Sequence, residues 1–204
     1  MNSTLDYYNK NAATFAEGTV SVDFAETRER FLAKLPSDAS ILDLGCGSGR
    51  DTKAFLQRGF RVTAVDGSPE LCALAAAYTG IPVRHMLFSE LDEREAYDGI
   101  WACASLLHVP SAELPGIFRR VIFALKPGGI LYASFKYSTF EGERNGRHFT
   151  DFTEESFAVF IAHFPECSIE DQWISADVRP SRSSERWLNL LLQKDQRSEI
   201  GNQK

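Results

Sequence analysis

Three glycines at alternate positions, Gly45, Gly47 and Gly49, follow an apolar run that ends at Leu44. A strand that breaks into a helix through glycines is typical of a ligand-binding turn, because glycine adopts unusual dihedral angles and lets a ligand approach the backbone. The spacing is G-x-G-x-G, whereas the fingerprint that wraps a dinucleotide pyrophosphate is G-x-G-x-x-G. An acid, Asp43, stands two residues before the first glycine. For the glycines alone, a tight turn without a ligand is the alternative.

A second acid, Asp66, ends a β-branched segment that begins at Phe60. It follows the glycine turn by about twenty residues, and the carboxyl ends of neighbouring strands in a doubly wound sheet meet at one crevice. A carboxylate there can accept both hydroxyls of a ribose, so Asp66 indicates a nucleoside pocket. The alternative role is the N-cap of the next helix. Ser68 fits that role better, because Pro69 follows it at the first helical position.

The pattern acid-x-G-x-G-x-G, formed by Asp43 and the three glycines, resembles the first motif of class I, Rossmann-like methyltransferases that use S-adenosyl-L-methionine. The strand that opens with Tyr97-Asp98 and the Lys126-Pro127-Gly128-Gly129 turn also look like this family. The chain is most similar to small bacterial methyltransferases of the tellurite-resistance and ubiquinone-biosynthesis type, from residue 7 to residue 192. The resemblance implies an α/β fold: a seven-stranded, mostly parallel, doubly wound sheet with helices on both faces and an antiparallel C-terminal hairpin.

The family resemblance implies a site for S-adenosyl-L-methionine at the carboxyl ends of four strands. Arg50, which begins the helix after the turn, is suited to the amino-acid carboxylate of that cofactor, although a solvated charge is the alternative. Many family members place an acid after the third strand, but this chain has Phe88-Ser89, so adenine is expected to stack on Phe88 and to bond the backbone near Ser89. Small side chains leave room after the fourth strand. The expected cofactor-binding residues are Tyr8, Asp43, Gly45, Cys46, Gly47, Gly49, Arg50, Asp66, Gly67, Ser68, Phe88, Ser89, Ala104, Ser105 and Leu106.

His108 is the candidate catalytic residue, in the loop after the fourth strand. A histidine near the transferred methyl group could accept a proton from an attacking hydroxyl, amine or thiol. A histidine that only caps a helix or packs under a lid is the alternative.

The stretch from 136 to 151 is interpreted as a long loop that caps the acceptor site, because connections of such length are usually functional or disordered. Tyr137, Arg144 and Arg147 are its expected substrate contacts, since arginines can hold an anionic acceptor. The alternative is a solvated loop whose charges cancel. Arg179 and Arg182, between the last two strands, are expected to be solvated, with a place at the border of the same pocket as the alternative.

The remaining elements follow from apolar periodicity. Two N-terminal helices are predicted at 2–16 and 22–35. The family resemblance implies that the N-terminal helix lies over the cofactor site as a lid, with Tyr8 and Phe15 as its candidate contacts and plain packing of these aromatics as the alternative. One methyltransferase domain is predicted over 1–194, with the lid at 1–36 and a flexible polar tail at 195–204. Further helices are predicted at 50–58, 111–125 and 153–164, and strands at 82–88, 130–135, 168–178 and 186–192.

Composition limits the classes of function. A chain of 204 residues with a net charge of -6 has no overall basic field, which makes nucleic acid an unlikely partner, with transfer RNA left as a lesser variant. It has no long apolar span and no signal-like start, so we expect a cytoplasmic location without membrane attachment. The four cysteines are scattered without a C-x-x-C pair, so no metal site is predicted. The oligomeric state is left open.

The sequence therefore predicts methyl transfer from S-adenosyl-L-methionine to a small-molecule acceptor. One rival is a nicotinamide-dependent oxidoreductase on the same sheet, against which the glycine spacing, Asp43 and the terminal hairpin argue. The other is a sensor that binds the cofactor without turnover, because no strong catalytic constellation is visible. No Asn-Pro-Pro-aromatic signature ends the fourth strand, which weakens the case for an exocyclic or amide nitrogen as the acceptor. The acceptor atom stays open among oxygen, nitrogen, sulfur and a metalloid.

Overall fold

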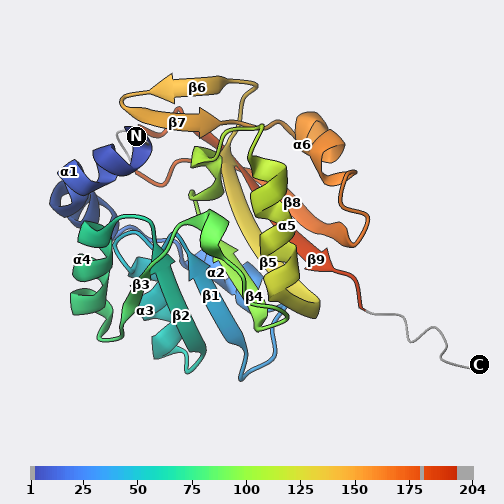
Figure 1. The fold of residues 1–204 in the computed structure, drawn as a ribbon, viewed down its shortest axis with the longest axis horizontal. Coiled ribbons are helices and arrows are strands. Elements are labelled where there is room, and N and C mark those ends of the chain that lie inside the picture. The colour runs from blue at the N-terminus through green and yellow to red at the C-terminus, as the bar shows by residue number, and fades with distance from the viewer. Residues whose placement is uncertain (1–2, 180–181, 197–204) are drawn as a thin grey trace, which may run out of the picture.

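A seven-stranded sheet forms the centre of the fold in the computed structural model, which describes residues 3–179 and 182–196 (Figure 1). The strand order is β3-β2-β1-β4-β5-β9-β8. The first five strands pair in parallel, and β9 pairs antiparallel with both β5 and β8. The predicted doubly wound sheet with an antiparallel C-terminal hairpin is confirmed. The strands are β1 (Ser40–Leu44), β2 (Arg61–Asp66), β3 (Val83–His85), β4 (Tyr97–Ala102), β5 (Leu125–Lys136), β8 (Cys167–Ala176) and β9 (Arg186–Lys194).

The strand order reverses at β1. From β1 the chain proceeds to β2 and β3 on one side, and then returns to place β4 on the other side. Ligands of open α/β sheets bind outside the carboxyl ends of the strands at such a point. The glycine turn after β1, Asp66 at the end of β2 and the segment after β4 therefore face one crevice.

Helices cover both faces of the sheet and leave two apolar cores. Side chains of α5 and α6 pack into the larger core, and those of α2 and α3 pack into the smaller one around Trp101. The ring of Trp101 stacks on that of Tyr132 with centroids 4.0 Å apart. The helices are α1 (Ser3–Thr19), α2 (Ala25–Leu32), α3 (Arg50–Gln57), α4 (Pro69–Thr79), α5 (Leu114–Ala124) and α6 (Glu154–Ile161), with short 3₁₀ turns at Phe88–Glu90 and Leu106–His108.

Local capping explains where two of the helices begin. The Ser68 side chain accepts a hydrogen bond from the Leu71 amide at 3.2 Å, and Pro69 occupies the first turn of α4. Ser68, and not Asp66, is thus the cap of α4. Thr153 caps α6 in the same way through the Ser156 amide, as predicted, although that helix ends at Ile161 and not at Phe164.

The prediction of a loop from 136 to 151 is wrong. Strand β5 continues through Lys136, and a two-stranded antiparallel hairpin follows, formed by β6 (Glu141–Arg144) and β7 (Arg147–Thr150). Its turn is Asn145-Gly146, with φ of 51° and 76°. Asn-Gly between two strands is the signature of a two-residue hairpin turn, because both positions need positive φ. That signal was present in the sequence and was missed.

Several predicted bounds also change. The third strand spans only Val83–His85 instead of 82–88, because the chain turns into a 3₁₀ helix at Phe88. Helix α1 extends to Thr19, three residues beyond its predicted end, whereas α2 is shorter than the predicted 22–35.

Helix α1 lies at the periphery of the fold. Helix α1 packs on α4 and β7, so it lies beside the hairpin β6–β7 at one end of the sheet (Figure 1). No helix within the described residues is long and apolar enough to cross a membrane. Most of the tail predicted at 195–204, from residue 197 onward, lies outside the described residues.

Candidate functional site

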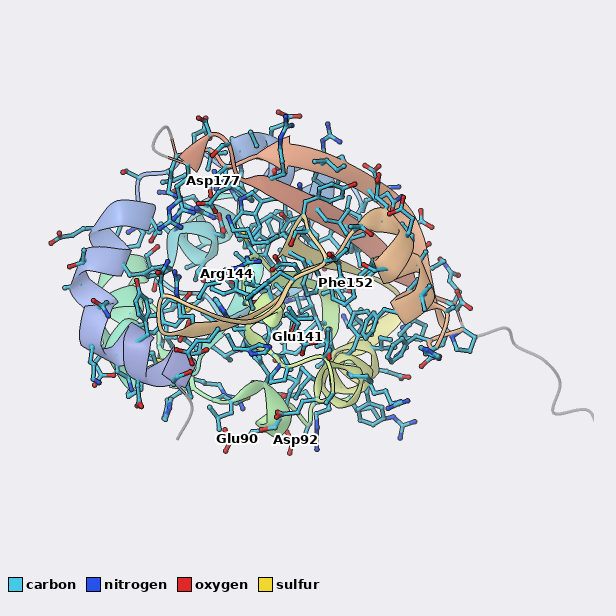
Figure 2. All side chains as sticks on the ribbon, turned by 90° about the horizontal axis from the view of Figure 1, so that it is seen from above. Glu90, Asp92, Glu141, Arg144, Phe152 and Asp177 are labelled. Carbon is cyan, nitrogen blue, oxygen red and sulfur yellow. The ribbon has the colours of Figure 1, made fainter. Side chains whose placement is uncertain are left out.

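A cavity of about 960 Å³ opens over the carboxyl ends of β1, β2 and β4. Small-molecule sites occupy roughly 300–1,000 Å³, so this volume suits a cofactor together with a small second molecule. Side chains of α1 and of the hairpin β6–β7 line its outer side. Figure 2, viewed from above, shows α1 beside the tip of that hairpin, with Arg144 over the middle of the molecule.

Most residues predicted for the site line this cavity, but three do not. Gly49 lies under α4, where an added Cβ would be 2.8 Å from Cγ2 of Thr79. Ser68 is fully buried as the cap of α4, and Leu106 is fully buried in the core while its neighbour Leu107 lines the cavity. The predicted residues that do line the cavity are Tyr8, Asp43, Gly45, Cys46, Gly47, Arg50, Asp66, Gly67, Phe88, Ser89, Ala104, Ser105, His108, Tyr137, Arg144 and Arg147.

Two positions of the turn favour glycine, because each has a positive φ and a close neighbour on the side where a Cβ would lie. Gly45 has φ of 83°, and an added Cβ would lie 2.6 Å from Cβ of Ser105, so a side chain would push away the segment after β4. Gly47 has φ of 55°, and its missing side chain leaves room for the ring of Phe15, whose Cε1 would be 3.1 Å from an added Cβ. The turn is therefore shaped to admit close neighbours on the cavity side.

Asp66 is tied directly to the glycine turn. The Gly47 amide donates to Oδ2 and the Ser68 amide donates to Oδ1, both at 2.9 Å. Burial raises the pKa of this carboxyl, and the backbone donors offset that rise in part. A carboxylate oxygen accepts more than one hydrogen bond. Asp66 is thus oriented at the cavity wall with acceptor capacity to spare, which fits a pair of ribose hydroxyls.

Asp43 lies deeper, with 3% of its surface exposed. Thr52 Oγ1 donates to its Oδ2 at 2.5 Å. Burial, reinforced by the nearby Asp51 charge, raises the pKa of Asp43 to about 7. Its carboxyl can therefore carry a proton in a range where ordinary aspartates are ionised.

Asp51 organises the predicted cofactor residue Arg50, and sequence reasoning missed it. Arg50 donates to both of its oxygens, Nε to Oδ1 at 3.0 Å and Nη2 to Oδ2 at 2.6 Å. Arg28 and the Trp101 indole also donate to this carboxylate, at 2.8 and 3.0 Å. Burial alone would raise the pKa of Asp51, but the two arginines outweigh it and lower that pKa. Arg50 borders the cavity with its charge already compensated, and its ring contact with Phe24, 4.7 Å to the centroid, holds it flat.

A second ion-pair cluster lines the cavity and includes Arg179, which was expected to be solvated, with the pocket border as the alternative. Asp177 accepts from Arg179 Nε at 2.8 Å and from Nη2 at 2.6 Å, and the Trp187 indole donates to it at 3.1 Å. Lys136 Nζ lies 3.5 Å from Asp177 and pairs with Glu185. These cations therefore have carboxylate partners. Lys136 was not predicted here, because it was assigned to a loop and not to the end of β5.

His108 is bonded at both ring nitrogens. Its Nδ1 lies 2.7 Å from the His148 carbonyl oxygen, which can only accept, so Nδ1 carries the hydrogen. Its Nε2 lies 2.8 Å from the Tyr8 hydroxyl, which must then be the donor. Burial lowers the pKa of His108 to about 4, and the nearby Arg147 charge adds to that effect. His108 is thus a neutral, weakly basic histidine whose free lone pair is engaged by α1.

The three predicted substrate residues differ in their surroundings. Arg144 Nη2 bonds the buried Asp151 Oδ2 at 2.6 Å, so its charge is compensated. The Tyr137 hydroxyl lies 3.5 Å from Glu154. Arg147 has neutral neighbours: its guanidinium carbon lies 4.5 Å from the Tyr7 ring centroid.

Comparisons with known proteins agree with this geometry. The family model described as "Methyltransferase domain" matches residues 16–176. The ubiquinone biosynthesis O-methyltransferase of Xanthomonas axonopodis pv. citri is 33% identical over 106 residues, which cover 48% of this chain and 44% of that protein. Its counterpart from Methylobacterium nodulans is 29% identical over 137 residues, covering 64% of this chain and 53% of that protein. The chain thus spans about half the length of the curated relatives it matches.

A solved structure covers more of the chain. The 1,6-didemethyltoxoflavin-N1-methyltransferase of Burkholderia thailandensis, solved with 1,6-didemethyltoxoflavin and S-adenosylhomocysteine, superposes with a TM-score of 0.74 at 26% identity. The superposition covers 94% of this chain and 85% of that one. The match of the family model to most of the chain, together with the sheet order and the glycine turn, shows that this chain belongs to the methyltransferase-domain family.

Proposed function

We propose that the protein transfers a methyl group from S-adenosyl-L-methionine to a small-molecule acceptor. The observation that carries this proposal is the hydrogen bond from the Gly47 amide to the Asp66 carboxylate. This bond joins the glycine turn after β1 and the acid that ends β2 into one wall of the cavity. The arrangement supports the binding of one nucleoside by both segments. The Burkholderia structure with bound S-adenosylhomocysteine supports the same ligand class.

The residues present fit such a cofactor. Asp66 would bind the ribose, Phe88 and Ser89 the adenine, and Asp43 and Arg50 the amino-acid end. Ala104 and Ser105 would border the sulfur, and Ser105 Oγ is buried without a hydrogen-bond partner among the described residues. When bound, the cofactor supplies a methyl group on a positively charged sulfur.

The chain's own task is then alignment and exclusion of water. Tyr8 and Phe15 of α1, packed edge to face with centroids 5.1 Å apart, would close the cofactor side of the cavity. His108 could take a proton at Nε2 only after Tyr8 releases that atom. We also infer that residues 1–194 form one methyltransferase domain with α1 as a lid, which the packing of α1 on α4 and β7 supports. Helix α2 takes no part in this lid, because its side chains pack in the smaller core and none of its residues lines the cavity.

Calorimetric titration with S-adenosylhomocysteine and with NADH tests the proposal. We expect micromolar binding of the thioether and none of NADH. Asp66→Ala should weaken thioether binding by about tenfold or more, because hydrogen bonds to a charged group contribute roughly 1.5–3 kcal/mol. Glu70→Ala removes an exposed acid of α4 and serves as the control for charge.

Two outcomes would contradict the proposal. Binding of NADH in place of S-adenosylhomocysteine would make the cavity a nicotinamide site. If the thioether binds but methyl-labelled cofactor, incubated with a metabolite extract, keeps all of its label, then the protein is a sensor without turnover.

A further inference from the structure

We propose that the acceptor binds as an anion beside Arg147, with its nucleophilic atom already ionised, so that no side chain has to remove a proton during methyl transfer. This inference rests on the proposed function and narrows its substrate class. The acceptor would be a small planar molecule whose acidic hydroxyl or ring N–H forms a delocalised anion.

The first argument is charge pairing in the acceptor half of the cavity. Arg144 is paired with Asp151, and Lys136 and Arg179 share the carboxylates of Asp177 and Glu185. Arg147 has no ion pair within the described residues. Arg186 also lacks one there, but its side chain is exposed at the rim. Arg147 is therefore an uncompensated positive charge inside the cavity wall.

The second argument is the fixed position of Arg147. Its guanidinium carbon lies 4.5 Å from the Tyr7 ring centroid and 5.2 Å from that of Phe149. Its Nη1 lies 3.5 Å from the Tyr8 hydroxyl, and its Nε is buried without a hydrogen-bond partner among the described residues. Arg147 as a whole is half-buried, but a buried donor atom without a partner is costly unless a ligand satisfies it. A planar anion would supply the missing acceptor and stack against the same rings.

The third argument is that the groups beside this guanidinium that could act as a base are already engaged. His108 donates through Nδ1 to the His148 carbonyl, and its Nε2 accepts from Tyr8, so it has no free lone pair. Two of the acids that line the cavity, Asp151 and Asp177, are both committed to arginines. An acceptor that has already lost its proton to solvent, and that Arg147 holds as an anion, needs none of them.

The step balances without a proton. The acceptor anion donates an electron pair to the methyl carbon, a bond forms between them, and the carbon–sulfur bond breaks with its pair left on sulfur. The negative charge of the acceptor and the positive charge of the sulfonium cancel. The methylated product is neutral at that atom and loses its attraction to Arg147, which favours its release.

The test uses 4-nitrophenol as the probe, because its phenol and phenolate forms absorb differently. The protein is first saturated with S-adenosylhomocysteine, and absorbance is then followed against pH. We expect the bound probe to ionise at least about one pH unit below its value in solution, since an opposite charge within about 4–6 Å shifts a pKa by 1–3 units. Arg147→Gln should abolish this shift and weaken phenolate binding about tenfold or more. Arg147→Lys should keep part of the shift.

Two controls separate this inference from the proposed function. Arg119→Gln removes an exposed arginine of α5 that does not line the cavity, and it should leave the shift unchanged. All variants should still bind S-adenosylhomocysteine like the wild type. If the thioether binds but the wild type neither binds nor ionises the probe, or if His108→Gln removes the shift and Arg147→Gln does not, the inference is wrong and the proposed function stands. Failure of the wild type to bind the thioether would overturn the proposed function and the inference with it.

Discussion

Two aspartates on either side of the glycine turn, Asp43 in β1 and Asp51 in α3, have pKa values that shift in opposite directions. Both are buried, which by itself favours the neutral carboxyl. Asp51 accepts hydrogen bonds from two arginines and an indole, and its pKa is lowered in spite of burial. Among the described residues, Asp43 accepts a side-chain hydrogen bond from the Thr52 hydroxyl alone, and burial raises its pKa to about 7. The partners, and not the residue type, decide which carboxyl is ionised.

Asp43→Asn should therefore change how stability depends on pH. The folded chain favours the protonated carboxyl, whose pKa rises from 3.8 to about 7, so it binds more protons than the unfolded chain between those values. Wild-type stability should fall over this range as pH rises, by up to about 1.4 kcal/mol per pH unit from this group. The amide of the variant cannot ionise, so the difference in free energy of unfolding, variant minus wild type, should grow from pH 4 to pH 7.

Urea unfolding of both proteins at pH 4, 5, 6 and 7, without ligand, measures this difference. Glu70→Asn, at an exposed acid, is the control and should show no such trend. A constant difference across the four pH values would mean that Asp43 is ionised in the folded chain throughout.

At the scale of elements, α1 and the hairpin β6–β7 close the cavity together. Thr4 Oγ1 accepts from the His148 amide at 2.9 Å, and the Tyr8 hydroxyl donates to His108 at 2.8 Å. At its other end α1 places Phe15 on the glycine turn. Helix α1 is thus attached to three segments that are distant in sequence, and its position depends on all of them.

Tyr8→Phe should loosen α1. Loss of one buried hydrogen bond costs about 1 kcal/mol and leaves Nε2 of His108 without its donor. Amide hydrogen exchange in residues 3–19 should then accelerate roughly fivefold, because about 1 kcal/mol corresponds to that factor in an opening equilibrium.

Tyr7→Phe is the matched control on the same helix. Tyr7 contacts Arg147 through its ring, which phenylalanine retains, so exchange should stay close to that of the wild type. Equal acceleration in both variants would show that the Tyr8–His108 bond does not hold the helix.

At the scale of the whole molecule, β9 lies between β5 and β8 and joins the hairpin to the parallel strands. Asn189, with 1% of its surface exposed, accepts from the Tyr132 hydroxyl of β5 at 2.8 Å and donates to Ser175 Oγ of β8 at 3.0 Å. Tyr132 in turn stacks on Trp101 of β4. One polar side chain thus links the strands β5, β9 and β8.

Asn189→Leu should lower the global free energy of unfolding by about 1–3 kcal/mol, because the buried Tyr132 hydroxyl loses the acceptor that Asn189 supplies. The double variant with Tyr132→Phe should cost less than the sum of the two single changes, since removing both partners removes the unsatisfied group. Urea unfolding of the four proteins measures the coupling, and strict additivity would contradict the role assigned to this bond.

The sequence by itself determined the sheet class, the glycine turn at which we propose that a nucleoside binds, and the capping of α4 and α6. These features depend on residues that are close in the chain: glycines whose positive φ forces a turn, an acid at the end of a β-branched strand, and Ser68 before Pro69. Local sterics and hydrogen bonding specify them almost alone. Asn145-Gly146 belongs to the same class, and the hairpin it forms could have been predicted.

Only the tertiary structure decided which charges remain available. The sequence could place Arg50, Arg144, Arg147 and His108 near one crevice. Whether each of these side chains is already paired depends on other groups that the fold brings next to it. Asp51 compensates Arg50, Asp151 compensates Arg144, and Tyr8 engages His108 across 100 residues of sequence. Among the three arginines, Arg147 alone has no carboxylate partner in the described part of the chain, and its side-chain hydrogen bond to the Tyr8 hydroxyl is long, at 3.5 Å. Electrostatic interactions act through space and depend on burial, so pairing of this kind is a property of the folded chain and not of its local pattern.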